Sequence, residues 1–161
     1  MSIWFRLQVN KNQNGLYAVC YQMLKNSLEA EEVVQESFVK LWQAQESGKK
    51  QSKAWLYQVA RNHCLDIIRR RQQEIKYQHY SLMQEKNTPS AYDELANTEL
   101  SQQISTAIEE LKEPYKSLLV LRELSQLSYQ QLAQVLDLSL SQVKVYLSRA
   151  RQMMKEKLTR S

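Results

Sequence analysis

Two helix-start signals lie eleven residues apart near the end of the sequence. Ser128 is followed three residues later by Gln131, and Ser139 is followed three residues later by Gln142. In a capping box the serine hydroxyl accepts a hydrogen bond from the third helical amide, and the glutamine side chain returns to the serine amide. Two such boxes at this spacing predict two helices joined by a short turn. That is the spacing of a helix-turn-helix, whose second helix enters the major groove of DNA.

The apolar residues around these signals fit the same prediction. Leu138 would fill the angle between the two helices, and Asp137 occupies a turn position that often needs a positive φ. Glycine adopts that conformation freely, and aspartate tolerates it better than most other residues, so we expect a slightly costlier turn of unchanged geometry. The contacts between the helices are predicted to come from Leu132, Ala133, Leu136, Val143 and Leu147.

The second of these helices presents a basic outward face. With a rotation of about 100° per residue, the apolar side chains of this helix gather on one side. The opposite side carries a stripe of short polar residues flanked by basic residues. Val145 on this stripe could touch a thymine methyl, while lysine and arginine could take phosphates or guanine. The alternative is a solvated helix face that happens to be basic. The candidate DNA contacts are Ser141, Gln142, Lys144, Val145, Ser148 and Arg149.

The whole chain is predicted to be all-α. Two glycines and two prolines among 161 residues are far fewer than a turn-rich β protein needs. Leucine, glutamine, glutamate, lysine, arginine and alanine are abundant and favour helices. Apolar periodicity predicts helices over 16–25, 30–44, 54–73, 99–111, 114–124, 129–136 and 140–158.

The middle of the chain lacks this periodicity and contains Pro89. A segment of this kind favours a flexible linker, which we place at residues 76–97. The sequence therefore predicts two small helical domains, over residues 1–75 and 98–161.

Charge is distributed unevenly along the chain. The total is +5 with a pI of about 9.2. Residues 28–46 carry a local charge of −4, residues 49–71 carry +6, and residues 139–161 carry +5. One acidic and two separate basic surfaces suggest at least two kinds of partner, since charge distribution governs association.

The predicted helix over 54–73 has the residue types of a single-stranded nucleic-acid surface. Trp55, Gln58, Asn62 and Arg69 share one face, with Arg61 toward its edge. An aromatic ring supplies stacking, amides supply hydrogen bonds to bases, and guanidinium groups neutralise phosphates. The alternatives are that Trp55 belongs to the core and that Asp66 pairs with Arg70. The predicted buried stripe is Leu56, Val59, Ala60, Cys64 and Ile67.

Other classes of protein find little support. Cys20, His63, Cys64 and His79 could form a metal site on paper, but neighbouring residues diverge on a helix, so we expect no metal and no cofactor. No secretory signal or long apolar run is present, which predicts a cytoplasmic protein with reduced thiols and no direct membrane insertion. No nucleophile–base pair or phosphate-binding glycine loop is present, so we expect no enzyme activity and no small-molecule substrate.

Three motifs, in their order and spacing, resemble one known family. "AEEVVQESFVKLW" (30–42), "AWLYQVARNHCLDIIRRR" (54–71) and "LSYQQLAQVLDLSLSQVKVYLSRAR" (127–151) are similar to the extracytoplasmic-function (ECF) sigma factors of the bacterial sigma-70 family. The resemblance covers nearly the whole chain from about Leu16. It implies a region 2 domain at 1–75, a region 4 domain at 98–161, and a non-catalytic specificity subunit of RNA polymerase.

The resemblance also assigns roles to residues of the first domain. The helix containing "AEEVVQESF" would dock on the β′ clamp helices of core polymerase through Glu31, Glu32, Val34, Gln35, Glu36 and Phe38. The next helix would recognise and melt the minus-10 element, and the loop between Glu46 and Lys53 would capture a flipped base. The implied minus-10 residues are Trp55, Gln58, Arg61, Asn62, Asp66, Arg69 and Arg70, with Arg71 as a further phosphate contact.

The second domain would read the minus-35 element and touch the polymerase β flap. Here the chain departs from the family, because Lys144-Val145-Tyr146 replaces the usual Lys-Ser-Arg, which leaves the preferred promoter sequence open. Another departure is a short start, from which we expect an abbreviated or irregular first helix before Gly15. The resemblance further implies an anti-sigma factor, which could hold the protein at the membrane.

Two other functions stay open at this point. One is a helix-turn-helix regulator that binds duplex DNA without being a polymerase subunit. The other is a helical adaptor that binds only proteins and has incidental basic patches.

Overall fold

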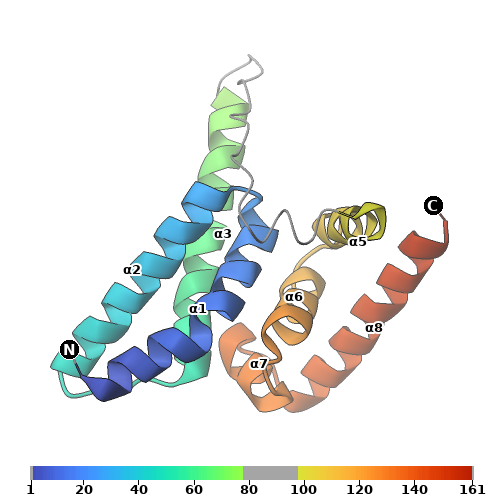
Figure 1. Cartoon of the computed structure of the whole chain (residues 1–161). Helices are drawn as coiled ribbons and strands as arrows, with labels where there is room; N and C mark the ends of the chain where they lie inside the picture. Colours follow the sequence, from blue (N-terminus) through green and yellow to red (C-terminus); the bar gives the residue numbers. More distant parts are fainter. Residues whose placement is uncertain (1, 78–97, 161) are drawn as a thin grey trace.

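The computed structural model describes residues 2–77 and 98–160 as seven helices without a strand (Figure 1). The all-α prediction is confirmed for these residues. Three helices form an N-terminal bundle and four form a C-terminal bundle. Of the predicted linker, residues 76 and 77 belong to α3, and residues 78–97 lie outside the described part of the chain. The helices are α1 (Ile3–Leu24), α2 (Ser27–Glu46), α3 (Lys53–Tyr77), α5 (Glu99–Glu109), α6 (Tyr115–Ser125), α7 (Tyr129–Leu136) and α8 (Leu140–Thr159).

The first helix is continuous through Gly15, so the expectation of an abbreviated or irregular start is wrong. Ser2 caps the helix by accepting a hydrogen bond from the amide of Phe5 at 3.1 Å. Phe5 is buried, and its ring meets that of Trp42 on α2 edge to face, with centroids 5.3 Å apart. The cap and this aromatic contact hold the first turns in place, which explains why the helix does not fray.

The buried face of α3 differs in part from the predicted stripe. Ala60 and Cys64 are fully buried as expected, whereas Val59 and Ile67 are only half-buried. Tyr57, which the prediction omitted, is 2% exposed. The reason is tertiary: α3 packs on α1 and α2 and also on α7, so apolar contacts extend beyond one helical stripe.

The helix-turn-helix forms as predicted. Ser128 and Gln131 make both hydrogen bonds of a capping box, and so do Ser139 and Gln142. Asp137 between α7 and α8 has φ 54° and ψ 50°, in the left-handed region. All of the predicted contacts between the two helices are buried or half-buried, and Val135 is an additional buried residue: Leu132, Ala133, Val135, Leu136, Leu138, Val143 and Leu147.

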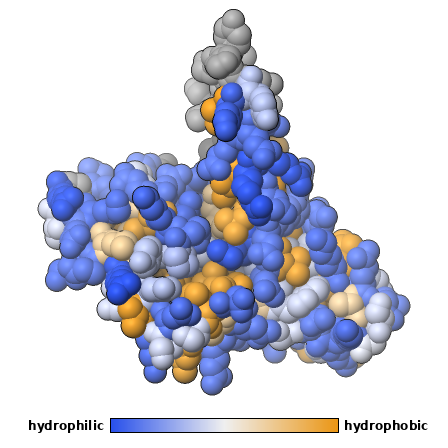
Figure 2. All heavy atoms as spheres, turned by 180° about the vertical axis from the view of Figure 1, so that it is seen from behind, coloured by the Kyte–Doolittle hydropathy of each residue, from blue (hydrophilic) through white to orange (hydrophobic). Residues whose placement is uncertain are grey.

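The two bundles pack directly against each other. In Figure 1, α6 lies beside α1 and α7 lies beside the lower part of α3, and both contacts occur between residues far apart in sequence. The C-terminal end of α3 extends beyond α1 and α2, and Tyr77 there is 83% exposed. Seen from behind, the surface is mainly hydrophilic with small hydrophobic patches (Figure 2). None of the helices described here has a stretch long and apolar enough to cross a bilayer.

Candidate nucleic-acid interface

The outward face of α8 is open to solvent. Four of its residues, Val143, Leu147, Ala150 and Met154, are buried against the rest of the C-terminal bundle, as the periodicity predicted. The opposite stripe is exposed, including Val145 at 46%. All six residues predicted to contact the minus-35 element are exposed: Ser141, Gln142, Lys144, Val145, Ser148 and Arg149.

Bases on α8 have different surroundings. Arg151 donates a hydrogen bond to Glu123 of α6 at 3.0 Å, which raises the pKa of the arginine, and Lys157 pairs with Glu110 at 3.0 Å. Lys144 and Arg149 form no ion pair with any residue that the structure describes. The basic residues Lys144 and Arg149, in the N-terminal half of α8, are therefore available to bind an anion. Arg151 and Lys157, further along the helix, also hold the bundle together.

Tyr146, which departs from the family pattern, lies toward the protein. It is half-buried, and its ring meets that of Tyr115 edge to face at 5.7 Å between centroids. The guanidinium carbon of Arg149 lies 5.8 Å from the centroid of the Tyr146 ring. Tyr146 thus contacts both the start of α6 and Arg149, an exposed basic residue on the outward face of α8.

The predicted minus-10 face of α3 is only partly open. Asn62, Asp66, Arg69 and Arg70 are exposed, whereas Trp55 and Gln58 are half-buried, so the sequence overestimated how exposed the tryptophan is. Trp55 is partly buried against the hydrophobic core. Asp66 pairs with Arg69 at 2.8 Å, whereas the alternative considered from the sequence was a pair with Arg70.

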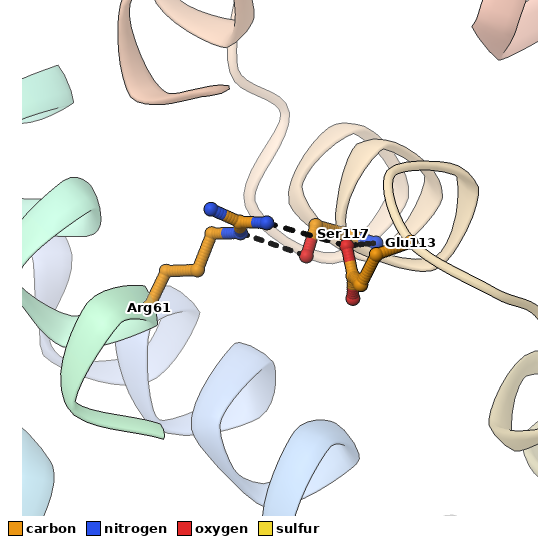
Figure 3. A network of polar contacts seen from close by, with 3 residues as sticks. All are labelled: Arg61, Glu113 and Ser117. Carbon is orange, nitrogen blue, oxygen red and sulfur yellow. Dashed lines mark hydrogen bonds and ion pairs between the residues drawn. The ribbon is translucent and has the colours of Figure 1, made fainter. Parts of the chain in front are cut away.

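Arg61 points away from solvent, into the contact between the two bundles. Its Nε donates a hydrogen bond to Oγ of Ser117 at 2.8 Å, and one terminal nitrogen lies 3.3 Å from Oε2 of Glu113 (Figure 3). The same carboxylate oxygen accepts a hydrogen bond from the amide of Ser117 at 3.3 Å. The Arg61 side chain is only 14% exposed in this arrangement of the bundles, and its contact with DNA stays a prediction. No sequence motif indicated that Glu113 and Ser117 would contact Arg61.

Arg71 has a structural role. It donates a hydrogen bond to the carbonyl oxygen of Leu24 at 2.9 Å and pairs with Glu29. These contacts fasten α3 to the connection between α1 and α2. The Arg71 side chain is still 36% exposed, and its contact with the DNA backbone stays a prediction.

Basic residues occupy the loop between α2 and α3, where a flipped base was expected to bind. Lys49 and Lys50 are exposed, and Nζ of Lys50 lies 5.7 Å from the ring centroid of Trp4. Gly48 has φ 90°, a conformation that favours glycine. Ser52 ends the loop by accepting a hydrogen bond from the amide of Trp55 at 3.1 Å, which fixes the start of α3.

The acidic face of α2 is exposed, but its two predicted apolar contacts are not. Val34 and Phe38 are 7% and 8% exposed and belong to the core of this chain. Leu28 and Val39, at 67% and 51% exposed, are the apolar side chains that accompany the acids. They were missed because their burial could not be read from the motif. The exposed polar residues are Glu31, Glu32, Gln35 and Glu36, of which Glu36 lies 3.6 Å from Nδ1 of His63.

Two residues of the candidate metal set, Cys20 and Cys64, are buried in the N-terminal bundle. Cys20 and Cys64 are buried free thiols, and their mutual hydrogen bond, together with burial, raises the pKa of Cys20. His63 lies toward Glu36 on α2. Among residues 2–77 and 98–160, no group of three histidine, cysteine or acidic residues is arranged to hold a metal ion. His79 of the candidate set lies outside the described residues.

Comparisons with known proteins identify the family. The model of sigma-70 region 2 matches residues 8–74, and that of sigma-70 region 4 matches residues 101–154. The RNA polymerase sigma factor YlaC of Bacillus subtilis is 32% identical, over 91% of this chain and 91% of its own length. The chain belongs to the ECF sigma factors of the sigma-70 family. The ECF sigma factor SigW of Bacillus subtilis is 26% identical over 91% of this chain and 84% of SigW.

The fold of this sigma factor also matches solved structures. The sigma factor RpoE of Bartonella quintana, solved with the anti-sigma factor NepR, gives a TM-score of 0.77 at 24% identity and covers 98% of both chains. CnrH, solved with the cytosolic domain of CnrY, gives 0.73 at 19% identity over 98% of this chain and 88% of CnrH. The N-terminal bundle is thus region 2 and the C-terminal bundle is region 4 of a sigma factor that directs promoter-specific transcription initiation.

Proposed function

We propose that this sigma factor divides its work among three separate surfaces. The outward face of α8 reads the minus-35 element, the face of α3 recognises and melts the minus-10 element, and the acidic face of α2 binds core RNA polymerase. The observation that carries this proposal is that one chain presents an exposed basic face on α8, a partly open face on α3 and a third, acidic face on α2. A regulator acting alone would have no use for the third.

The minus-35 contact rests on the exposed stripe of α8. Lys144 and Arg149 take phosphates or guanine, and Val145 supplies an apolar contact of the kind that fits a thymine methyl. The hydroxyls of Ser141 and Ser148 serve either bases or phosphates. Gln142 already accepts a hydrogen bond from the amide of Ser139 with its Oε1, so only its NH₂ group is free to contact DNA.

The minus-10 contact rests on the open part of α3 and the loop that precedes it. Trp55 and Gln58 offer a half-exposed aromatic and an amide beside exposed Asn62, while Arg69 and Arg70 neutralise phosphates. Flipping a base out of the duplex costs a few kcal/mol of stacking and pairing energy. Contacts between the protein and the unstacked strand would offset this cost, so melting requires no covalent chemistry. The sigma factor is accordingly a non-catalytic subunit.

The polymerase contact rests on charge. Glu31, Glu32 and Glu36 form an exposed acidic face with Leu28 and Val39 as apolar contacts, which suits a basic helical partner such as the β′ clamp helices. The β flap is the proposed partner of region 4. An anti-sigma factor is a further partner, supported by the similar RpoE structure, which was solved with the anti-sigma factor NepR. We place the protein in the cytoplasm, where such a factor could tether it to the membrane.

Run-off transcription with purified core polymerase and a promoter library tests the proposal. We expect specific transcripts whose start sites share paired minus-35 and minus-10 elements. Duplex binding by the sigma factor alone, with no specific initiation by any core enzyme including that of its own source, would favour a regulator that acts without polymerase.

A further inference from the structure

The first half of α1 has an exposed face that belongs to none of the three surfaces described above. We propose that this α1 face, together with Trp4 and the lysines of the loop between α2 and α3, binds the unpaired promoter strand beyond the base that the loop captures. Stacking and phosphate neutralisation would hold this single-stranded DNA. The inference rests on the proposed minus-10 role of the loop and extends the single-strand site onto another helix.

Basic and amide side chains predominate on the α1 face. With a rotation of about 100° per residue, the exposed residues between positions 3 and 14 fall on one half of the helix surface. The first acidic residue of the chain is Glu29, well beyond them. Basic side chains suit phosphates and amides suit base edges, while exposed apolar side chains can pack on base faces. The face consists of Ile3, Arg6, Leu7, Asn10, Lys11, Gln13 and Asn14.

The polar groups of the α1 face have no partner within the described residues. Its two basic side chains form no ion pair with residues 2–77 and 98–160, and its three amide side chains form no hydrogen bond with them. Asn12, on the opposite side of the helix, is buried and donates a hydrogen bond to the carbonyl oxygen of Gln8 at 2.9 Å. The buried amide thus serves the fold, and the exposed amides are available to a ligand.

Trp4 joins the α1 face to the loop between α2 and α3. Nζ of Lys50 lies 5.7 Å from the centroid of the Trp4 ring, which is half-buried. Nε2 of Gln45, near the end of α2, donates a hydrogen bond to Oγ of Ser2 at 2.7 Å. The start of α1 and the loop lie together at one end of the N-terminal bundle (Figure 1). The loop and the α1 face therefore form one continuous surface.

This continuous surface carries mainly positive charge. Within residues 2–14 and 45–52, Glu46 is the only acidic residue. Lys50 over the Trp4 ring resembles a site in which a base stacks on the ring and the ammonium group binds the adjacent phosphate. A polyanion with flat apolar bases thus complements both features of the surface. The exposed basic residues are Arg6, Lys11, Lys49 and Lys50.

The position of the surface gives the path of the strand. Because α3 begins at Lys53, directly after the loop, a strand that follows α3 toward Trp55 reaches the loop and then Trp4. At 1.5 Å per residue, the α1 face from Ile3 to Asn14 is about 16 Å long. That is the length of about four or five nucleotides spaced 3.4 Å apart. The face is thus long enough for a short single strand beyond the captured base.

Photo-crosslinking locates the strand on the protein. The probe is a fork-junction promoter bound to holoenzyme, whose unpaired minus-10 strand continues for about five further nucleotides with 5-iodouracil at one of them. We expect irradiation to join this strand to the peptide that contains Trp4, as identified by mass spectrometry. Trp4→Leu should lower the yield at least about fivefold, because the stacking surface is lost. A probe with 5-iodouracil in the duplex upstream of the minus-10 element is the control.

Substitutions at the surface test the phosphate contacts without disturbing the core. Arg6→Gln with Lys11→Gln should lower the affinity of holoenzyme for the extended strand by about fivefold at low salt. Affinity for a strand that ends at the minus-10 element should not change. Each lost phosphate contact should also lower the slope of log affinity against log salt by about 0.7. The matched control, Lys112→Gln with Lys155→Gln, removes two exposed positive charges from region 4.

The possible results separate this inference from the proposed function. Equal affinity of the wild type and the Arg6–Lys11 variant for the extended strand would overturn the inference, and so would crosslinking only to other parts of the holoenzyme. Weaker binding of that variant to core polymerase, with DNA binding unchanged, would make the face a protein contact and overturn it as well. If wild-type holoenzyme fails to bind even the strand that ends at the minus-10 element, the proposed function fails instead.

Discussion

The guanidinium carbon of Arg149 lies 5.8 Å from the centroid of the Tyr146 ring. Tyr146 is in turn held edge to face against Tyr115 at the start of α6. A cation over an aromatic face restricts where the guanidinium can go. The ring that replaces an expected DNA-contacting arginine therefore restricts the position of a neighbouring arginine on the outward face of α8.

Tyr146→Leu should weaken the preference for one minus-35 base pair. The expected loss is about 0.5–1 kcal/mol, the usual worth of an exposed cation–π contact. Tyr146→Phe keeps the ring and should behave as the wild type. Binding of holoenzyme to a library of minus-35 variants measures the preference. An equal loss with phenylalanine would mean that the tyrosine hydroxyl acts directly.

Trp55→Ala should impair DNA opening more than the first binding of duplex DNA. The half-exposed ring offers a stacking surface worth about 1–3 kcal/mol per base. Permanganate reactivity of the minus-10 strand and filter binding of the closed complex measure the two steps. A promoter with a pre-melted minus-10 segment should restore much of the activity. Equal loss in both steps would assign Trp55 to the core alone.

Glu31→Lys together with Glu32→Lys should weaken binding to core polymerase by at least about tenfold at low salt, since like charges across an interface are repelled. The difference should shrink as salt rises. Fluorescence anisotropy of labelled sigma factor titrated with core enzyme measures it. Glu46→Lys, at the end of the same helix, is the control. It changes the net charge by half as much, so an effect about half as large there would point to net charge instead of the α2 face.

The helix-turn-helix could be predicted from sequence because its signals are local. Capping boxes act within four residues, and the burial of Val143 and Leu147 follows from a period of 3.6. The left-handed conformation of Asp137 was predictable for the same reason. Each of these features depends on neighbours along one or two helices.

The contact between the bundles could not be predicted, since it joins residues that are distant in sequence. The local sequence around Arg61 is the same whether its side chain binds a phosphate or Glu113. Glu113 lies 52 positions away in the sequence. The sequence pattern did not determine whether Tyr57 and Phe38 are exposed or buried. Packing against other helices buries both side chains. The short start was taken as a sign of an irregular first helix before Gly15, whereas the helix is continuous and Gly15 permits close packing.

Tyr57 should make the stability of the protein sensitive to alkaline pH. Burial raises its pKa above the ordinary value of about 10, although the hydrogen bond with Ser125 offsets part of this rise. Its contribution is fully present below the unfolded pKa and is lost as pH rises above it, because the folded state retains the proton longer. Urea unfolding between about pH 9 and 11 should show a steeper decline for the wild type than for Tyr57→Phe. Parallel slopes would contradict the buried position.

Asp137 offers a test of the turn that is independent of DNA. A left-handed residue costs roughly 1–2 kcal/mol with most L side chains, less with aspartate, and nothing with glycine. Asp137→Gly should therefore raise the free energy of unfolding by at most about 1 kcal/mol, part of the gain being lost to greater freedom in the unfolded chain. Asp137→Val should lower it by about 1–2 kcal/mol, because a branched side chain fits this conformation poorly. Urea unfolding of the full chain measures both.

Because Asp137 is exposed and its backbone amide bonds to Ala133, the turn geometry should persist in the glycine variant, with an unchanged minus-35 preference. A changed preference would make Asp137 a DNA contact.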